Sequence, residues 1–157
     1  MPPTQYQPTI PLRVPVLAAD TSKSQDRVII PIRNTADIVI ARRSGRRMAL
    51  ASGASPAEST LIATIISELA RNIVRYARDG KIVLAKMRKG AQRGITISSC
   101  DRGPGIKDVG RALTGGYSTS GGLGMGLSGV RRVSDEFHMD SGNGNGTTVI
   151  AKKWLAS

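Results

Sequence analysis

Two short connections between strand-forming segments constrain this chain more than any other feature. Each joins two runs that are rich in β-branched or apolar residues, as the loop of a β-hairpin does. The connections are Gly90–Arg93, between Lys81–Lys89 and Gly94–Ser99, and Gly142–Gly146, between Glu136–Asp140 and Thr147–Trp154. Parallel strands need a crossover of about a dozen residues or more, so an all-parallel sheet is excluded.

Helical segments are interspersed with these strands. Ser55-Pro56-Ala57-Glu58 combines an N-cap serine, a proline at the first helical position and a glutamate at the third, and predicts a long helix from Pro56 to about Arg78. Thr35–Ser52 places apolar residues and arginines on a helical period, which predicts a basic amphipathic helix. Shorter helices are expected at Asp108–Leu113 and from Leu123 to Val133.

The first strand completes the expected fold. Arg27–Arg33 is rich in β-branched residues, and Pro31 within it predicts a position at a sheet edge. Short antiparallel connections and interspersed helices together predict a two-layer α/β sandwich, whose mixed and mainly antiparallel sheet is covered on one face by helices.

Length and composition indicate one domain. The chain has 157 residues, of which 39% are hydrophobic and only 3% aromatic, so we expect a single aliphatic core over residues 26–157. Residues 1–25 hold most of the prolines and are interpreted as a flexible leader.

No run of about 18 apolar residues is present, and the N-terminus lacks the layout of a secretory signal. The expected location is therefore the cytoplasm, without membrane insertion.

The formal net charge of +12 predicts attraction of anions. Nucleotides, acidic protein faces and nucleic acid are all compatible with it. The scarcity of aromatic residues removes the stacking platform of single-strand binders, so a solvated basic surface is favoured and nucleic acid is kept as the weaker alternative.

Two polar residues lie within the apolar stripe of the long helix. Spacings of three and four place Ile65, Glu68, Leu69, Asn72 and Tyr76 on one face. Burying a carboxylate or an amide without partners costs several kcal/mol, so these groups lie either at a solvated helix edge or against a ligand, a metal or a hydrogen-bond network. Mg²⁺ suits an amide oxygen here, and the carboxylate one turn earlier suits a base that accepts a hydroxyl proton.

Two glycine-rich segments follow the long helix. Asp101 directly follows a strand and precedes Gly103 and Gly105, so its carboxylate either accepts a hydrogen bond from the amine of adenine or forms an ordinary turn. Gly121–Gly126 precedes a predicted helix, whose free N–H groups favour phosphate. Ser118, Thr119 and Ser120 are interpreted as part of a mobile lid rather than as phosphate contacts.

The order and spacing of these motifs resemble the GHKL ATPase and kinase superfamily with its Bergerat fold. The likeness covers about residues 26 to 156. Within the superfamily, the chain most resembles the RsbT-type switch serine/threonine kinases of the stressosome, which are related to the anti-sigma factor kinases. The likeness rests on Ser67-Glu68-Leu69-Ala70-Arg71-Asn72, Asp101-Arg102-Gly103-Pro104-Gly105-Ile106, Gly116-Tyr117-Ser118-Thr119-Ser120-Gly121-Gly122-Leu123-Gly124 and Gly146-Thr147.

The resemblance implies a role for each matched residue. Glu68 would be the catalytic base, Asn72 would hold Mg²⁺ on ATP, Asp101 would contact adenine, and Thr147 would support the adenine site. The glycine segments would surround the nucleotide with Gly103, Gly105, Ser118, Thr119, Ser120, Gly121, Gly122, Leu123, Gly124, Met125 and Gly126.

The resemblance also implies partners. A serine or threonine of a STAS-domain scaffold or antagonist protein would accept the phosphoryl group. The kinase, once released from that protein, would bind and activate a PP2C-type phosphatase. The competing hypothesis is an anti-sigma factor that sequesters a sigma factor.

Overall fold

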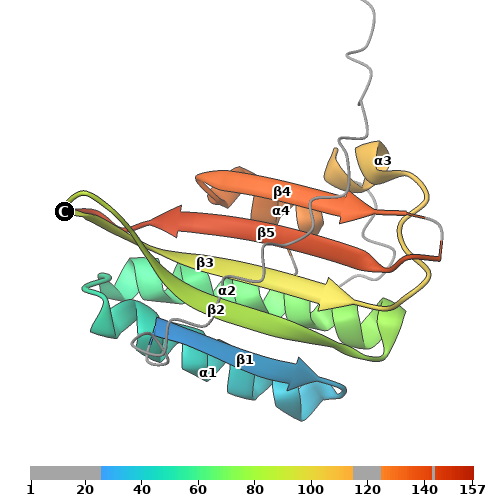
Figure 1. The fold of residues 1–157 in the computed structure, drawn as a ribbon, viewed down its shortest axis with the longest axis horizontal. Helices are drawn as coiled ribbons and strands as arrows, with labels where there is room; N and C mark the ends of the chain where they lie inside the picture. Colours follow the sequence, from blue (N-terminus) through green and yellow to red (C-terminus); the bar gives the residue numbers. More distant parts are fainter. Residues whose placement is uncertain (1–25, 115–124, 143) are drawn as a thin grey trace, which may run out of the picture.

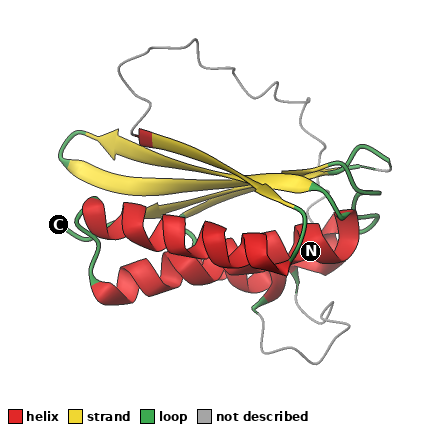
Figure 2. Cartoon of the chain, turned by 90° about the horizontal axis from the view of Figure 1, so that it is seen from below, coloured by secondary structure: helices red, strands yellow, loops and turns green. Residues whose placement is uncertain are grey.

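The described residues form a five-stranded sheet with its α-helices on one face (Figures 1 and 2). The computed structural model describes residues 26–114, 125–142 and 144–157. The strands lie in the order β1-β2-β3-β5-β4, and every pairing is antiparallel. Their bounds are β1 Arg27–Ile32, β2 Gly80–Lys89, β3 Gln92–Asp101, β4 Glu136–Ser141 and β5 Thr147–Trp154. The two-layer fold with helices on one face is confirmed. The prediction of a mixed sheet is wrong, because every strand pair among the described residues is antiparallel.

Two long helices pack against this face (Figure 2). Asn34 and Asp37 form a capping box at the start of α1 (Thr35–Ala51), and Ser55 and Glu58 form the predicted one at the start of α2 (Pro56–Asn72). These side chains satisfy N–H groups that have no partner within the helix. The shorter helices are α3 (Val109–Leu113) and α4 (Gly126–Val133).

Between the layers lies an aliphatic core, as the composition predicts. Ile62, Ile65, Ile66 and Leu69 of α2 are buried in the same cluster as strand residues such as Ile82, Leu84, Ile95 and Ile97. Removing a side chain of this size from water contributes about 1.5–3 kcal/mol. This packing fixes one face of α2 against the sheet and thereby orients its polar residues.

The second long helix changes its hydrogen-bonding pattern near its end. Beyond Asn72 the chain continues as a π-helix, η2 (Ile73–Ala77), whose i to i+5 hydrogen bond runs from the Arg78 N–H to the Ile73 carbonyl at 2.8 Å. The wider turn breaks the 3.6-residue period. Tyr76 lies in this π-helical turn and is 49% exposed, so it is not part of the buried core.

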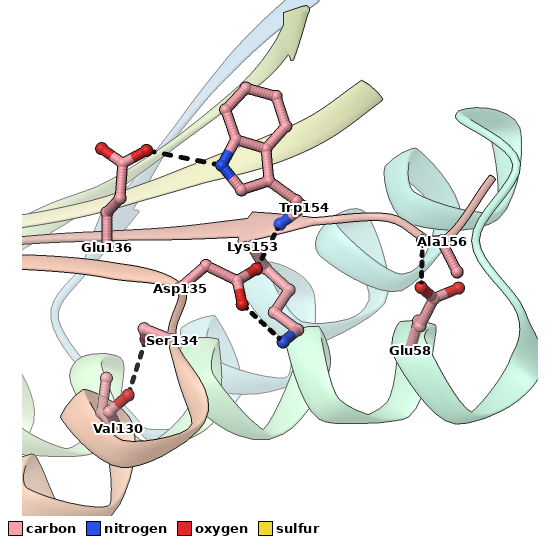
Figure 3. A network of polar contacts seen from close by, with 8 residues as sticks. All are labelled: Glu58, Val130, Ser134, Asp135, Glu136, Lys153, Trp154 and Ala156. Carbon is pink, nitrogen blue, oxygen red and sulfur yellow. Dashed lines mark hydrogen bonds and ion pairs between the residues drawn. The ribbon is translucent and has the colours of Figure 1, made fainter. Parts of the chain in front are cut away.

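Polar contacts join the end of β5 to the start of β4 and to α2 (Figure 3). The Asp135 carboxylate accepts from the Trp154 N–H at 2.7 Å and pairs with Lys153, while Glu136 accepts from the indole of Trp154. Glu58 accepts from the Ala156 N–H at 2.7 Å, so the capping residue of α2 also holds the end of the chain. No helix among the described residues is both long and apolar enough to span a bilayer.

The Glu58→Ala variant is expected to unfold about 1 kcal/mol more easily at pH 7, because it loses half of the capping box and the bond to Ala156. The Ala156 and Ser55 N–H groups hold the pKa of Glu58 below its ordinary value of 4.5. A lowered folded pKa gives stability that is present above 4.5 and lost as the pH falls through the folded value.

Urea unfolding of the wild type and of Glu58→Ala at several pH values between 3 and 7 measures this effect. Their difference should shrink toward low pH. Ser55→Ala, which removes the uncharged half of the same box, is the control and should show a weaker pH dependence. A difference for Glu58→Ala that is constant with pH would contradict the assignment.

Candidate active site

The buried carboxylate of Glu68 is the centre of the candidate site. Its side chain is only 9% exposed, and both of its carboxylate oxygens have partners. Oε1 accepts from the Arg71 guanidinium at 2.5 Å, and Oε2 accepts from the Gly126 N–H at 3.2 Å. Glu68 therefore does not lie at a solvated helix edge, and it links α2 to the first residue of α4.

One helical turn further along α2 lies Asn72, which is half-buried. Its amide forms no hydrogen bond with any residue in the described parts of the chain. The site thus pairs a carboxylate held by protein groups with an amide oxygen that is available to a ligand. No group of three or more acidic, histidine or cysteine side chains suited to a metal occurs in the described ranges.

Asp101 is the last residue of β3 rather than the first residue after it. Its Oδ1 accepts from the Gly103 N–H at 2.8 Å and from the Thr147 N–H at 3.1 Å. The second carboxylate oxygen has no hydrogen-bond partner among the residues that the structure describes. Both the turn and the ligand interpretation of Asp101 are compatible with this arrangement, because one oxygen organises the loop and the other stays available.

Contacts between the sheet and η2 bring the Asp101 loop close to the end of α2. The Cα of Gly80 lies so close to Ile73 and Asp101 that a Cβ built on it would be 2.8 Å from Ile73 Cγ2 and 3.1 Å from Asp101 Cβ. A Cβ on Gly103 would lie 2.8 Å from the Ala77 Cβ. The α2 and η2 segment and the Asp101 loop are therefore in direct contact, with Glu68 and Asn72 on the same segment.

Gly105 and Gly146 allow the loops of the site to pack backbone against backbone. Both have left-handed φ angles, +79° and +73°. A Cβ on Gly105 would lie 1.9 Å from the Gly142 carbonyl oxygen, and one on Gly146 would lie 2.1 Å from the Asp101 carbonyl oxygen. Only glycine fits both the conformation and the space at these positions.

The hydroxyl groups of Ser141 and Thr147 connect the loop after β3 to the end of β4 and the start of β5. The Ile106 N–H donates to the Ser141 hydroxyl at 2.7 Å, and the two hydroxyl oxygens lie 2.8 Å apart. Thr147 also donates its N–H to Asp101, so it lies beside the predicted adenine contact. Strand pairing of Ser141 with Thr147 creates this cluster.

The Gly146→Ala variant is expected to lose about 1–3 kcal/mol of stability and to bind nucleotide more weakly, because the added Cβ displaces Asp101. Gly144→Ala is the matched control, since Gly144 has a similar φ of +79° with no atom within 4 Å of the built Cβ. Thermal unfolding and nucleotide titration of both variants separate backbone strain from displacement. Equal losses in the two variants would contradict the role of the Asp101 contact.

Part of the predicted phosphate segment lies outside the described residues. This applies to Ser118, Thr119, Ser120, Gly121, Gly122, Leu123 and Gly124. Met125 and Gly126 are described: Met125 is the N-cap of α4, and Gly126 is its first residue, whose N–H contacts Glu68. The helix predicted from Leu123 therefore begins at Gly126 within the described chain.

Arg71 and Ser141 are two site residues that the sequence reasoning missed. The i, i+3 spacing of opposite charges at Glu68 and Arg71 is a signal that predicts their ion pair. Ser141 carries no such local signal, because its partners Ile106 and Thr147 come near it only through the folded loops and the pairing of β4 with β5.

Residues 57–156 match the model of the family of histidine kinase-, DNA gyrase B- and HSP90-like ATPases. The serine/threonine-protein kinase RsbT of Bacillus subtilis (strain 168) is 44% identical over 130 residues, which cover 83% of this chain and 98% of that protein. The anti-sigma F factor of Clostridium novyi (strain NT) is 34% identical over 106 residues, covering 64% of this chain and 73% of that protein.

Two further matches are more distant. The anti-sigma F factor of Caldanaerobacter subterraneus subsp. tengcongensis is 32% identical over 98 residues, which cover 60% of this chain and 68% of that protein. A chain of the SiaB-SiaC complex from Pseudomonas aeruginosa has a similar fold, with a TM-score of 0.51 and 15% identity over 82% of this chain and 89% of that chain. The chain therefore belongs to the family of histidine kinase-, DNA gyrase B- and HSP90-like ATPases and is a serine/threonine-protein kinase of the RsbT type.

Proposed function

We propose that this kinase transfers the γ-phosphoryl group of ATP to a serine or threonine hydroxyl of a partner protein, with Glu68 as the base. The observation that carries the proposal is the buried Glu68 carboxylate, held by Arg71 and by the N–H of Gly126 at the end of the glycine-rich segment. A carboxylate at that place is fixed in position relative to the phosphate side of the nucleotide.

Glu68 accepts the hydroxyl proton as the hydroxyl oxygen forms its bond to the γ-phosphorus. The bond between that phosphorus and the bridging oxygen to the β-phosphate breaks, and ADP leaves with the bonding electrons. Positioning and charge stabilisation account for most of the rate in such reactions. Arg71 contributes by fixing one carboxylate oxygen, and the Gly126 N–H contributes by fixing the other.

Asn72 fits a ligand of Mg²⁺, since its half-buried amide is without a partner among the described residues. In proteins Mg²⁺ takes one or two oxygens from side chains and the rest from phosphates and water. When bound, it would neutralise charge that develops on the phosphate oxygens.

Asp101 fits the adenine side of the site. The oxygen of Asp101 that is not used by Gly103 and Thr147 is an acceptor for the exocyclic amine of adenine. Guanine has a carbonyl oxygen at that position, and two acceptors would repel each other. Thr147 supports this contact by holding the other carboxylate oxygen.

The acceptor in this proposal is a STAS-domain scaffold or antagonist protein in the cytoplasm, within a stressosome-type signalling complex. A PP2C-type phosphatase is the second partner, bound and activated by the kinase after its release. The motif strings shared with RsbT-type kinases and the 44% identity to Bacillus subtilis RsbT support this proposal.

Incubation of the purified protein with γ-labelled ATP, Mg²⁺ and a STAS-domain protein from the same organism tests it. We expect label on the STAS-domain protein, dependence on Mg²⁺, and competition by unlabelled ATP but not by GTP. Release of free phosphate without labelled protein, or equal competition by GTP, would contradict the proposal.

The similarity to two anti-sigma F factors supports a second candidate function, the sequestration of a sigma factor. Capture of a purified sigma factor, rather than the STAS-domain protein, by the immobilised kinase with bound nucleotide would favour this function.

A further inference from the structure

The outward face of α1 carries a regular stripe of large side chains. Ile40, Arg43, Arg47 and Leu50 are spaced by three, four and three residues, so they lie along one side of the helix. All four are exposed, Ile40 at 54% and Leu50 at 46%. The buried residues of α1 lie on another face, which packs against α2 and the sheet (Figure 1). We refer to these four residues as the α1 stripe.

Positive charge is concentrated on and beside the stripe. Arg42, Arg43, Arg46 and Arg47 are exposed, and within the described residues none of them forms an ion pair. The one acidic residue of α1, Asp37, accepts from N–H groups at the helix start. Like charges four residues apart cost a few tenths of a kcal/mol, and nothing in the described chain offsets this cost.

The ends of the stripe favour a protein as the occupant. Arginines attract phosphates and carboxylates alike, but exposed Ile40 and Leu50 add aliphatic surface that contacts with a phosphate backbone do not use. Arginine next to buried apolar side chains is typical of the central part of protein interfaces. Planar guanidinium groups also match carboxylates in paired hydrogen bonds.

The N-terminal end of α1, where the stripe begins, is linked by an ion pair to the segment that follows η2. Arg33, directly before the helix-capping residue Asn34, pairs with Asp79 at 3.8 Å, just after η2. The N-terminal end of α1 therefore lies beside the segment that extends from Glu68 and Asn72.

We propose that the α1 stripe is the docking surface for the phosphoryl acceptor protein, whose matching face presents carboxylates flanked by aliphatic side chains. This inference rests on the proposed kinase function and adds the surface that selects the acceptor. Attraction of the acceptor by these arginines predicts faster association at low salt.

The test compares two double charge reversals of equal size. Arg43→Glu with Arg47→Glu alters the stripe, and Arg88→Glu with Lys89→Glu alters exposed residues at the end of β2. Transfer of label from γ-labelled ATP to the STAS-domain protein is measured at varied acceptor and salt concentrations, together with the Kd for ATP and circular dichroism of each variant.

We expect the stripe variant to raise the KM for the acceptor roughly 100-fold with an unchanged Kd for ATP, and the control to change KM less than about 3-fold. Ile40→Ser with Leu50→Ser should raise KM roughly 10-fold with little change in the salt dependence. These results would support docking on the stripe.

Equal effects of both charge reversals would overturn the inference, because net charge alone would then explain them. Loss of affinity for a DNA or RNA duplex in the stripe variant, with an unchanged KM for the acceptor, would assign the surface to nucleic acid instead. Failure of the kinase proposal is distinguishable, since the wild type itself would then label no acceptor.

Discussion

Replacing Glu68 by glutamine is expected to lower the rate of phosphoryl transfer about 10²–10⁴-fold and to leave ATP binding intact. Glutamine has nearly the same shape and keeps an oxygen that accepts the Gly126 N–H. It cannot take the hydroxyl proton, and it loses the charge that pairs with Arg71. Binding survives because the proposed adenine contact, Asp101, lies on β3 rather than on α2.

Single-turnover transfer at saturating ATP and acceptor measures this effect, and a fluorescent ATP analogue measures binding. Glu136→Gln is the matched control, since Glu136 is an exposed carboxylate on β4 that pairs with Lys152. We expect wild-type transfer from the control. A Glu68→Gln rate within a few fold of the wild type would rule out this carboxylate as the base.

The Asp101→Asn variant is expected to bind ATP about 10- to 100-fold more weakly, which corresponds to about 1–3 kcal/mol for an unpaired polar group. The asparagine oxygen still accepts from Gly103 and Thr147, so the loop keeps its shape. The NH2 group of the side-chain amide then takes the place of the second carboxylate oxygen. This NH2 group faces the exocyclic amine of adenine. Both groups are donors, so the hydrogen bond between them is lost.

Calorimetric titration with ATP and with GTP measures this loss. Asp140→Asn provides a control with the same change of charge, on an exposed residue of β4. The Asp101 variant should lose preference for ATP over GTP, whereas the control should keep it. An unchanged affinity for ATP would show that Asp101 serves the turn alone.

The fold could be predicted from local signals in the sequence. The capping box at Ser55 and Glu58 fixes the start of α2, Pro31 marks β1 as an edge strand, and the glycine-containing connections give the hairpins. These signals act between residues close in sequence. The π-helical turn Ile73–Ala77, directly after Asn72, has no comparable signal in the sequence.

The site could be predicted only in part for the same reason. Spacing on a helix indicated Glu68 and Asn72 as a pair, and glycine at alternate positions indicated the Asp101 loop. The bond from Gly126 to Glu68 joins residues 58 positions apart, and the contact of Ser141 with Ile106 joins residues 35 positions apart. Neither contact exists before the chain folds, so no short stretch of sequence contains it.

The chemical identity of the labelled residue tests the central claim most directly. After transfer from γ-labelled ATP, the acceptor protein is treated with acid and its phosphoamino acids are separated, for the wild type and for Glu68→Gln. Phosphate esters of serine and threonine survive acid, whereas phosphohistidine does not. We predict acid-stable phosphoserine or phosphothreonine that depends on Glu68. Acid-labile label on the acceptor, or acid-stable label formed equally well without the Glu68 carboxylate, would contradict the account.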